Sequence, residues 1–355
     1  MADTITIKGM ESRARRFLDV QTVEQLAKIL GKDPMKLAVL AALPQYREFD
    51  IPKKNGGKRH IEDPAPPLKK VQRKLNDFLQ AVYFFHRTDN AFGFITNPVD
   101  DPSPRHILTN AQAHLGCRWL LNVDMKDFFH LVSQERTEQL FEAPLFGFGE
   151  HVSTLLASLA CYKGRLPMGA PTSPVISNLV SIPLDEDLNA FARERGWTYT
   201  RYADDMSFSS QTEIPPDAVQ EIEAWVKAYD FELNPAKVKL FGPGSPNPKE
   251  VTGLHVGETE IGLGADYTGQ LTGAIQHLND IVDAQYLTPS GKSQPSRWVE
   301  ELEAMVRGKL EFARQILGEA DPLYQDLSLR LENALEPPET YGPLTWLEFG
   351  YATPR

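Results

Sequence analysis

Three aspartates stand where short apolar runs of the sequence end. Asp204 and Asp205 are adjacent in a tight turn between two strand-like runs, and Asp124 directly follows the apolar run Trp119–Val123. Carboxylates at the ends of neighbouring strands can converge on one point, which suits two Mg²⁺ ions about 3.5–4 Å apart that catalyse phosphoryl transfer. Mg²⁺ needs few protein carboxylates when substrate phosphates complete its shell. Asp-Asp turns are also common for purely structural reasons, so the pair alone leaves both interpretations open.

A basic stretch lies near the N-terminus of an acidic chain. The whole sequence carries a net charge of −11, which argues against a general nucleic-acid binder. Between Tyr46 and Lys74, however, Lys and Arg outnumber Asp and Glu by five. A solvated charged face would explain this excess. The sharper hypothesis is a local phosphate-binding site on an acidic body.

Composition excludes several classes of protein. Hydrophobic residues make up 41% of the 355 positions and charged residues 24%, which is typical of globular chains. No apolar run approaches the roughly 20 residues of a membrane span, and residues 1–16 lack the apolar core of a signal peptide. Cys117 and Cys161 are too few for a disulfide framework or a cysteine-based zinc site. We therefore expect a cytoplasmic protein without a membrane partner.

Periodicity and turn residues predict the elements that must position these groups. Helical spacing of apolar residues is separated by Gly- and Pro-containing joints from runs that alternate like strands. We expect helices over 13–44, 68–85, 151–162, 173–195 with a kink at Pro183, 269–285, 297–317 and 322–335, hairpins over 46–61 and 251–263, and strands over 119–123, 197–202 and 206–209.

Four segments in order resemble the motifs of reverse transcriptases. The segment Tyr202–Asp205 resembles the catalytic box, and Asn122–Phe129 resembles the first acidic motif. The segment Gly164–Pro174 with Ile176–Asn178 resembles the template and nucleotide motif, and Leu233–Lys237 resembles the Lys-bearing motif that follows. Four motifs in register are far more specific than any one of them. The resemblance runs from about residue 46 to 256 and more loosely to the C-terminus.

Two further segments resemble the retron group of this family. Asn110–His114 is similar to its Asn-Ala-x-x-His element, and Val251–Leu254 is similar to its Val-Thr-Gly element. Some positions depart from the family pattern. Met168 stands where many reverse transcriptases have Gln, and Gly257 and His130 replace a frequent Asn and Pro. None of these changes removes a catalytic carboxylate.

The resemblance implies an α+β, right-hand polymerase fold with fingers, a palm containing an antiparallel sheet, and a helical thumb. Residues 1–118 would form the N-terminal helices and fingers, 119–265 the palm, and 266–355 the thumb and C-terminal tail. Asp124, Asp204 and Asp205 would be catalytic and would bind two Mg²⁺ ions, with the backbone carbonyl of Met125 as a further ligand.

The resemblance also implies residues that contact substrates. In the fingers hairpin Lys53 or Lys54 and Arg59 would bind the triphosphate of the incoming nucleotide. The other nucleotide contacts would be Phe129 under the sugar, Met168 and Gly169 at the base pair, and Lys237 at the leaving pyrophosphate, although a surface lysine is the alternative for Lys237. Expected RNA or template contacts are Asn110, His114, Pro171, Thr252, Gly253, Gly308 and Lys309.

A retron enzyme is expected to copy part of a structured non-coding RNA into multicopy single-stranded DNA that stays joined to the RNA. The resemblance implies dNTP substrates, priming from a 2′-hydroxyl of a guanosine, a separate effector protein and a role in anti-phage defence. Rival hypotheses are a group II intron-like, diversity-generating or abortive-infection reverse transcriptase, and a non-catalytic RNA-binding module that restrains an effector.

Overall fold

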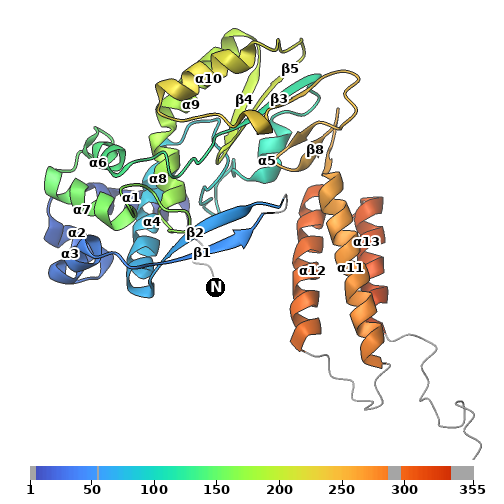
Figure 1. Cartoon of the computed structure of the whole chain (residues 1–355), viewed down its shortest axis with the longest axis horizontal. Helices are drawn as coiled ribbons and strands as arrows, with labels where there is room; N and C mark the ends of the chain where they lie inside the picture. Colours follow the sequence, from blue (N-terminus) through green and yellow to red (C-terminus); the bar gives the residue numbers. More distant parts are fainter. Residues whose placement is uncertain (1–4, 54–55, 287–296, 337–355) are drawn as a thin grey trace, which may run out of the picture. The chain divides into compact units, whose positions relative to one another are not determined.

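The computed structural model describes residues 5–53, 56–286 and 297–336. It divides into two compact units, Met1–Thr252 and Gly253–Arg355 (Figure 1). In the described part of the chain, no helix combines the length and the apolar character that crossing a bilayer requires. The division into fingers, palm and thumb at residues 118 and 265 stays a prediction.

The expected helical stretch 13–44 consists of three helices, because local capping signals end each one. Thr22 forms a capping box with Gln25 at the start of the second helix, and Gly31 ends that helix in a left-handed conformation with φ of 68°. Asp33 caps the third helix, whose first residue is proline. The three helices are α1 (Ile7–Leu18), α2 (Val23–Leu30) and α3 (Pro34–Ala42).

A four-stranded antiparallel sheet forms the centre of the larger unit. Its strand order is β4-β5-β3-β6, so β3 lies between β5 and β6. The strands β3 (Trp119–Asp124), β4 (Thr198–Tyr202) and β5 (Asp205–Ser210) match the predicted ones, and β6 (Lys239–Phe241) was not predicted. The apolar side chains of β3 belong to the core because helices and strands cover this central strand.

The predicted fingers hairpin is present as β1 (Tyr46–Pro52) paired with β2 (Lys58–Pro64) (Figure 1, blue). The long helix α4 (Pro66–His86) follows it and packs against α1 and α8. The expected kinked helix over 173–195 is two helices, α8 (Ser173–Val180) and α9 (Ile182–Glu194). Pro183 explains the break, since it has no N–H to continue the helical ladder and is favoured in a first turn.

The remaining helices of the larger unit are short. The 3₁₀ turn η1 (Pro235–Lys237) carries Lys237, and the helices α6 (Gln134–Glu142) and α10 (Ala218–Ala228) were not predicted. The remaining elements are α5 (Ile107–Gln112), α6 (Gln134–Glu142), α7 (Glu150–Ala160), α10 (Ala218–Ala228), η1 (Pro235–Lys237) and β7 (Glu250–Val251).

The smaller unit has a hydrophobic core of its own. The short antiparallel strands β8 (Leu254–Val256) and β9 (Ile261–Leu263) precede three helices. Leu271 and Leu278 of the first helix are fully buried, as is Val306 of the second. The helices are α11 (Ala265–Tyr286), α12 (Arg297–Leu317) and α13 (Pro322–Leu335), which agree with the predicted ones apart from an earlier start of α11.

Candidate active site

The sheet brings the three predicted carboxylates together. Asp124 is the last residue of β3 and pairs across the sheet with Asp205, the first residue of β5. The β4–β5 turn carries Asp204, whose carbonyl oxygen accepts a hydrogen bond of 2.9 Å from the backbone N–H of Met125. Neighbouring antiparallel strands therefore place at one edge of the sheet residues that are 80 positions apart in the chain.

Repulsion among the three carboxyl groups accompanies their convergence. Loss of surrounding water, followed by repulsion from Asp204 and Asp124, raises the pKa of Asp205 to about 7, and because the surface of this residue is exposed, the two neighbouring charges are the firmer cause. Loss of water and the charge of Asp124 also raise the pKa of Asp204. The Asp124 residue itself is buried, with 4% of its surface exposed. A cation between these groups would relieve this repulsion.

Lys237 supplies a positive charge to this cluster. Its Nζ lies 2.5 Å from Oδ2 of Asp124, and the backbone N–H of Asn234 donates to the Asp124 carbonyl oxygen at 2.8 Å. Partial burial would lower the pKa of Lys237, but the hydrogen bond and charge of Asp124 outweigh it, so the pKa is raised. Lys237 is an exposed lysine, with 56% of its side chain accessible, that pairs with the buried Asp124, and its predicted contact with pyrophosphate stays a prediction.

The donor set fits a hard divalent cation. All three side chains offer carboxylate oxygens, which Mg²⁺ and similar ions prefer, and one ammonium group offsets only part of their charge. The Met125 side chain is buried, with 1% exposed, so only its backbone could contribute a ligand. The chemistry of these residues therefore agrees with a metal site that the substrate phosphates would complete.

A second group of possible metal ligands lies on the fingers hairpin. Ligand atoms of Glu48, His60 and Glu62 lie within 4.8 Å of one another. These groups already have protein partners, because Glu62 accepts two bonds from the Arg165 guanidinium at 2.8 and 3.1 Å and Glu48 accepts one from Lys163 at 2.6 Å. We interpret the group as an ion-pair network that ties the hairpin to residues 162–165.

A buried ion pair supports the turn that carries Asp204. The Arg201 guanidinium, on a residue 1% exposed, donates to both carboxylate oxygens of Asp185 at 2.7 and 2.6 Å. Its remaining nitrogen donates to the carbonyl oxygen of Ala203 at 3.0 Å and to the Asn178 side chain at 2.9 Å. Ala203 has a φ of 60°, an uncommon value for a residue other than glycine. Arg201 therefore stabilises a strained turn through its hydrogen bond to the Ala203 carbonyl oxygen.

This supporting frame was missed from the sequence. The sequence offers one local signal, namely that Arg201 is a charged residue within a strand-like run. On this strand Tyr199 and Arg201 are both buried, and a buried charge requires a partner. Gly93 belongs to the same frame, because its carbonyl oxygen accepts a bond of 2.9 Å from Asn178. A Cβ atom on Gly93 would lie 2.6 Å from the backbone nitrogen of Ala203, so only glycine allows this approach.

The paired phenylalanines after Asp124 differ in their environments. Phe128 is 4% exposed and its ring centroid lies 5.4 Å from that of Phe231, within the core. Phe129 is half-buried, and its ring lies 5.9 Å from the ring of Phe94. Phe128 is therefore a core ring, and contact of the more accessible Phe129 with the sugar of the nucleotide stays a prediction.

The fingers hairpin contacts the segment with the predicted base-pair residues. The carbonyl oxygen of Met168 accepts a hydrogen bond of 2.8 Å from the N–H of Glu62. Gly169 has a φ of 136°, and a Cβ there would lie 2.8 Å from the Glu62 carbonyl oxygen, so glycine is needed for close packing. Arg59 and Lys53 are exposed, and the charge of Arg59 opposes part of the rise in the pKa of Asp204 that burial and Asp124 cause. Lys54 lies outside the described residues.

Comparison with known proteins identifies the family. The family model described as reverse transcriptase (RNA-dependent DNA polymerase) matches residues 51–259. This chain belongs to the reverse transcriptase family. Retron Mx162 reverse transcriptase of Myxococcus xanthus is 34% identical over 72% of this chain and 58% of its own length. Retron Ec86 reverse transcriptase of Escherichia coli is 30% identical over 70% of this chain and 75% of its own. The chain is a retron-type reverse transcriptase by this similarity.

The lengths differ among these relatives, since this reverse transcriptase spans little more than half of the first one. A solved telomerase from Candida albicans aligns with 82% of this chain and 60% of its own, with a TM-score of 0.45 and 11% identity. The family match agrees with the predicted α+β, right-hand polymerase fold. Enzymes of this family depend on divalent metal ions in general, which agrees with the carboxylate cluster.

Two of the predicted RNA contacts of this reverse transcriptase face the protein interior. Asn110 and His114 are each 1% exposed. The ring nitrogens of His114 lie 2.7 Å from the hydroxyls of Ser209 and Thr200, so α5 is linked to β4 and β5. Side chains so buried cannot touch RNA in this conformation. We correct the expected role of His114 to support of the sheet and that of Asn110 to a buried position on α5, because a short peptide does not reveal such burial.

The burial of His114 predicts a pH-dependent stability. Burial lowers its pKa to about 4 from the ordinary 6.5, so the folded protein binds fewer protons than the unfolded chain between these values. Stability must therefore fall as pH falls below 6.5, by about 2 kcal/mol for this residue between pH 7.5 and 5. Denaturant unfolding of wild type and His114→Gln should show this loss only in wild type. Parallel pH profiles would contradict a neutral, buried His114.

The other predicted template contacts lie in different surroundings. Pro171 is half-buried and lines a cavity that also includes Tyr202. Thr252 and Gly253 have φ values of 50° and 82°, typical of a turn. Gly308 is exposed on α12, where a Cβ would meet nothing within 4 Å, and the Nζ of Lys309 lies 5.6 Å from the Tyr267 ring centroid. Contact of these residues with RNA stays a prediction.

Proposed function

We propose that this reverse transcriptase copies a structured non-coding RNA into single-stranded DNA that stays joined to the RNA. The observation that carries the proposal is the convergence of Asp124, Asp204 and Asp205 at one edge of the sheet. Three carboxylate side chains at one point suit metal-assisted nucleotidyl transfer, and burial together with mutual repulsion raises the pKa of Asp204 and of Asp205. The family match and the similarity to retron enzymes support RNA as template.

We assign the chemistry of the site as follows. Two Mg²⁺ ions, held by the three carboxylates and the Met125 carbonyl, would supply positive charge to the attacking and leaving oxygens. Arg59 and Lys53 would bind the triphosphate from the fingers hairpin, with Arg59 able to contact two oxygens at once. Lys237 would stabilise the charge of the leaving pyrophosphate.

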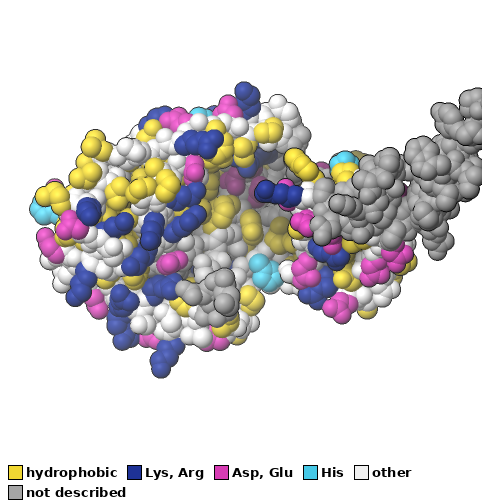
Figure 2. Space-filling view, turned by 90° about the horizontal axis from the view of Figure 1, so that it is seen from below, with side chains coloured by type: hydrophobic (Ala, Val, Ile, Leu, Met, Phe, Trp, Pro, Cys, Tyr) yellow, Lys and Arg dark blue, Asp and Glu magenta, His cyan; other side chains and the backbone are white. Residues whose placement is uncertain are grey.

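We further propose the subdomains that the resemblance implies. Residues 1–118 act as fingers, 119–265 as palm and 266–355 as thumb. The partners are the RNA, its DNA copy, dNTPs and a separate effector protein, and the setting is anti-phage defence in the cytoplasm. Exposed Lys and Arg side chains on the larger unit (Figure 2) give an acidic chain a local surface for phosphates.

Nucleic acid extracted from the purified full-length protein tests the proposal. A branched species that contains both RNA and DNA is expected after expression with the neighbouring genomic DNA. RNA alone would favour a binding module that restrains an effector, and DNA without an RNA template would favour an abortive-infection polymerase. Either of these results would overturn the proposed function.

Phe129→Val is predicted to admit ribonucleotides. A rigid ring under the sugar leaves no room for a 2′-hydroxyl, so its removal should raise relative rNTP use by one to two orders of magnitude, roughly 1–3 kcal/mol of discrimination. Single-nucleotide addition with dNTP and rNTP measures this ratio. The matched control Phe128→Val removes a core ring and should mainly lower stability. An active Phe129→Val enzyme with an unchanged ratio would show that another residue selects the sugar.

A further inference from the structure

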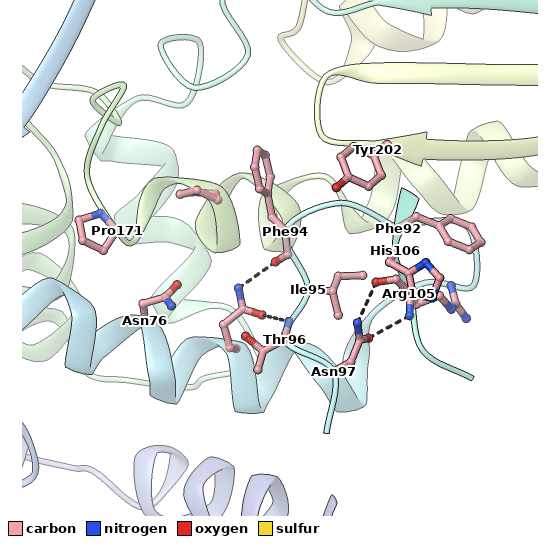
Figure 3. Close-up of a pocket in the computed structure, with 12 residues that line it drawn as sticks. Asn76, Phe92, Phe94, Ile95, Thr96, Asn97, Arg105, His106, Pro171 and Tyr202 are labelled. Carbon is pink, nitrogen blue, oxygen red and sulfur yellow. Dashed lines mark hydrogen bonds between the residues drawn. The ribbon is translucent and has the colours of Figure 1, made fainter. Parts of the chain in front are cut away.

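A cavity of about 420 Å³ lies in the larger unit beside the candidate active site. Side chains from α4, from the segment after it and from residues 171–174 line it (Figure 3). Its volume falls within the roughly 300–1,000 Å³ of small-molecule sites. The cavity is close to the nucleotide region, because the ring of its lining residue Phe94 contacts that of Phe129 at 5.9 Å.

Flat apolar groups form one wall of this cavity. Phe94 is 38% exposed and, in the view of Figure 3, stands between Pro171 and Tyr202. The φ of Phe94 is 58°, which is rare for an aromatic residue and costs roughly 1–3 kcal/mol. Such strain persists only where surrounding structure enforces it, and it clusters at ligand sites.

Hydrogen bonds hold this strained segment in place. The side-chain amide of Gln80 donates to the Phe94 carbonyl oxygen at 2.8 Å, and its own oxygen accepts from the N–H of Thr96 at 3.0 Å. Asn97 pairs in the same reciprocal way with the backbone of Arg105, at 2.9 Å in both directions. The cavity is therefore formed before any ligand arrives, which reduces the entropy that binding would cost.

The charge in the cavity wall is already neutralised. The Arg105 guanidinium bonds to the Asp89 carboxylate at 3.1 Å and to the Ala91 carbonyl oxygen at 3.3 Å, and it lies 4.9 Å from the Phe92 ring centroid. A phosphate inside the cavity would find this cation engaged. Asn76 and Thr96 offer uncharged polar groups instead, so the interior suits a flat, neutral, hydrogen-bonding ligand.

A cation suitable for phosphate lies outside the cavity. Arg73 is exposed and precedes Asn76 by three residues on α4, so the two side chains share one face of this helix. A nucleotide whose base enters the cavity could therefore leave its phosphate near Arg73, in water. Stacking on aromatic side chains is how proteins bind unpaired bases of single strands.

We propose that this cavity binds one unpaired nucleobase of the RNA template strand, stacked on Phe94 and hydrogen-bonded at its edge by Asn76. The inference rests on the proposed function in that RNA is the template. It adds a site that reads or anchors an extruded base next to the nucleotide to be copied. Because Gly93 packs against Ala203, the segment that would hold the base directly adjoins the catalytic turn.

The test uses the full-length protein and RNA hairpins that carry a short 5′ overhang, without dNTPs. Each overhang position is replaced in turn by an abasic nucleotide, and dissociation constants are measured by fluorescence anisotropy. In wild type, one position should show roughly tenfold weaker binding when abasic, the scale of one base–aromatic stack. Phe94→Ala should bind the intact overhang about tenfold more weakly and lose this dependence on the base.

Two further variants keep the test decisive. Phe85→Ala is the matched control, since Phe85 is a similarly exposed aromatic, 44% accessible, that does not line the cavity. It should keep the wild-type dependence. Asn76→Ala should weaken intact-overhang binding severalfold and reduce the preference among bases, while unfolding temperatures confirm that each variant is folded.

Equal losses in folded Phe94→Ala and Phe85→Ala, or no position that depends on its base, would overturn the inference. Since no synthesis is measured, this failure is distinguishable from failure of the proposed function. If the protein makes the branched RNA–DNA species but no overhang position depends on its base, the proposed function stands and only the proposed ligand of the cavity is wrong.

Discussion

Asp204→Asn is expected to abolish extension of a primer on an RNA template, which means that the extension rate falls by roughly 10³-fold or more. The carboxylate lies with Asp124 and Asp205 at one edge of the sheet, and loss of one metal ligand removes several kcal/mol of transition-state stabilisation. Thermal stability without Mg²⁺ should hold or rise, because neutral Asn relieves repulsion among three carboxyl groups that Lys237 offsets only in part. Primer extension with Mg²⁺ and thermal unfolding without it measure the two effects.

The control for this variant is Asp217→Asn. Asp217 is exposed at the N-cap of α10, and Asn is an equally good residue at that position. Extension and stability should both stay near wild type. Near-normal extension by Asp204→Asn would mean that the catalytic centre lies elsewhere.

Loss of the buried Arg201–Asp185 pair should lower both stability and activity. Arg201→Met leaves the Asp185 carboxylate fully buried with only hydroxyl partners, Tyr199 at 2.8 Å and Thr88 at 3.4 Å. Removing one partner of a buried ion pair costs about 3–5 kcal/mol. The turn also loses the bond to the Ala203 carbonyl oxygen, so Asp204 should be less well positioned and extension should fall about tenfold to a hundredfold. Denaturant unfolding and primer extension check these values.

A double variant separates positioning from simple stability. Arg201→Met with Asp185→Leu removes both charges, and such a replacement is often neutral or stabilising. The double variant should therefore regain most of the stability of Arg201→Met, while extension stays low because the Ala203 carbonyl has no anchor. If the stable double variant extends primers as fast as wild type, the Arg201–Asp185 pair only stabilises the fold and does not position Asp204. As a surface control, Arg297→Met breaks an exposed pair with Glu301, and should cost only a few tenths of a kcal/mol.

Much of the fold could be predicted because its signals are local. The three strands around the aspartates and the three C-terminal helices agree with the prediction, whereas the break at Gly31 was missed and that at Pro183 was expected only as a kink, although local signals cause both. The turn that carries Asp204 and Asp205 was visible as two acids between strand-like runs. Its convergence with Asp124 needed one assumption, namely that β3 and β5 are neighbours in one sheet.

The sequence by itself therefore determined most of the elements, the order of the motifs and the three carboxylates that the sheet brings together. Tertiary structure alone decided the partners of these groups. Lys237 bonds to Asp124, which is 113 positions away in the chain. The side chains of Arg201 and Asp185 form an ion pair from which water is excluded. His114 is buried against two strands. The physical reason is that burial and the hydrogen bonds it demands depend on residues distant in the chain. Local patterns carry no information about which distant segment will supply them.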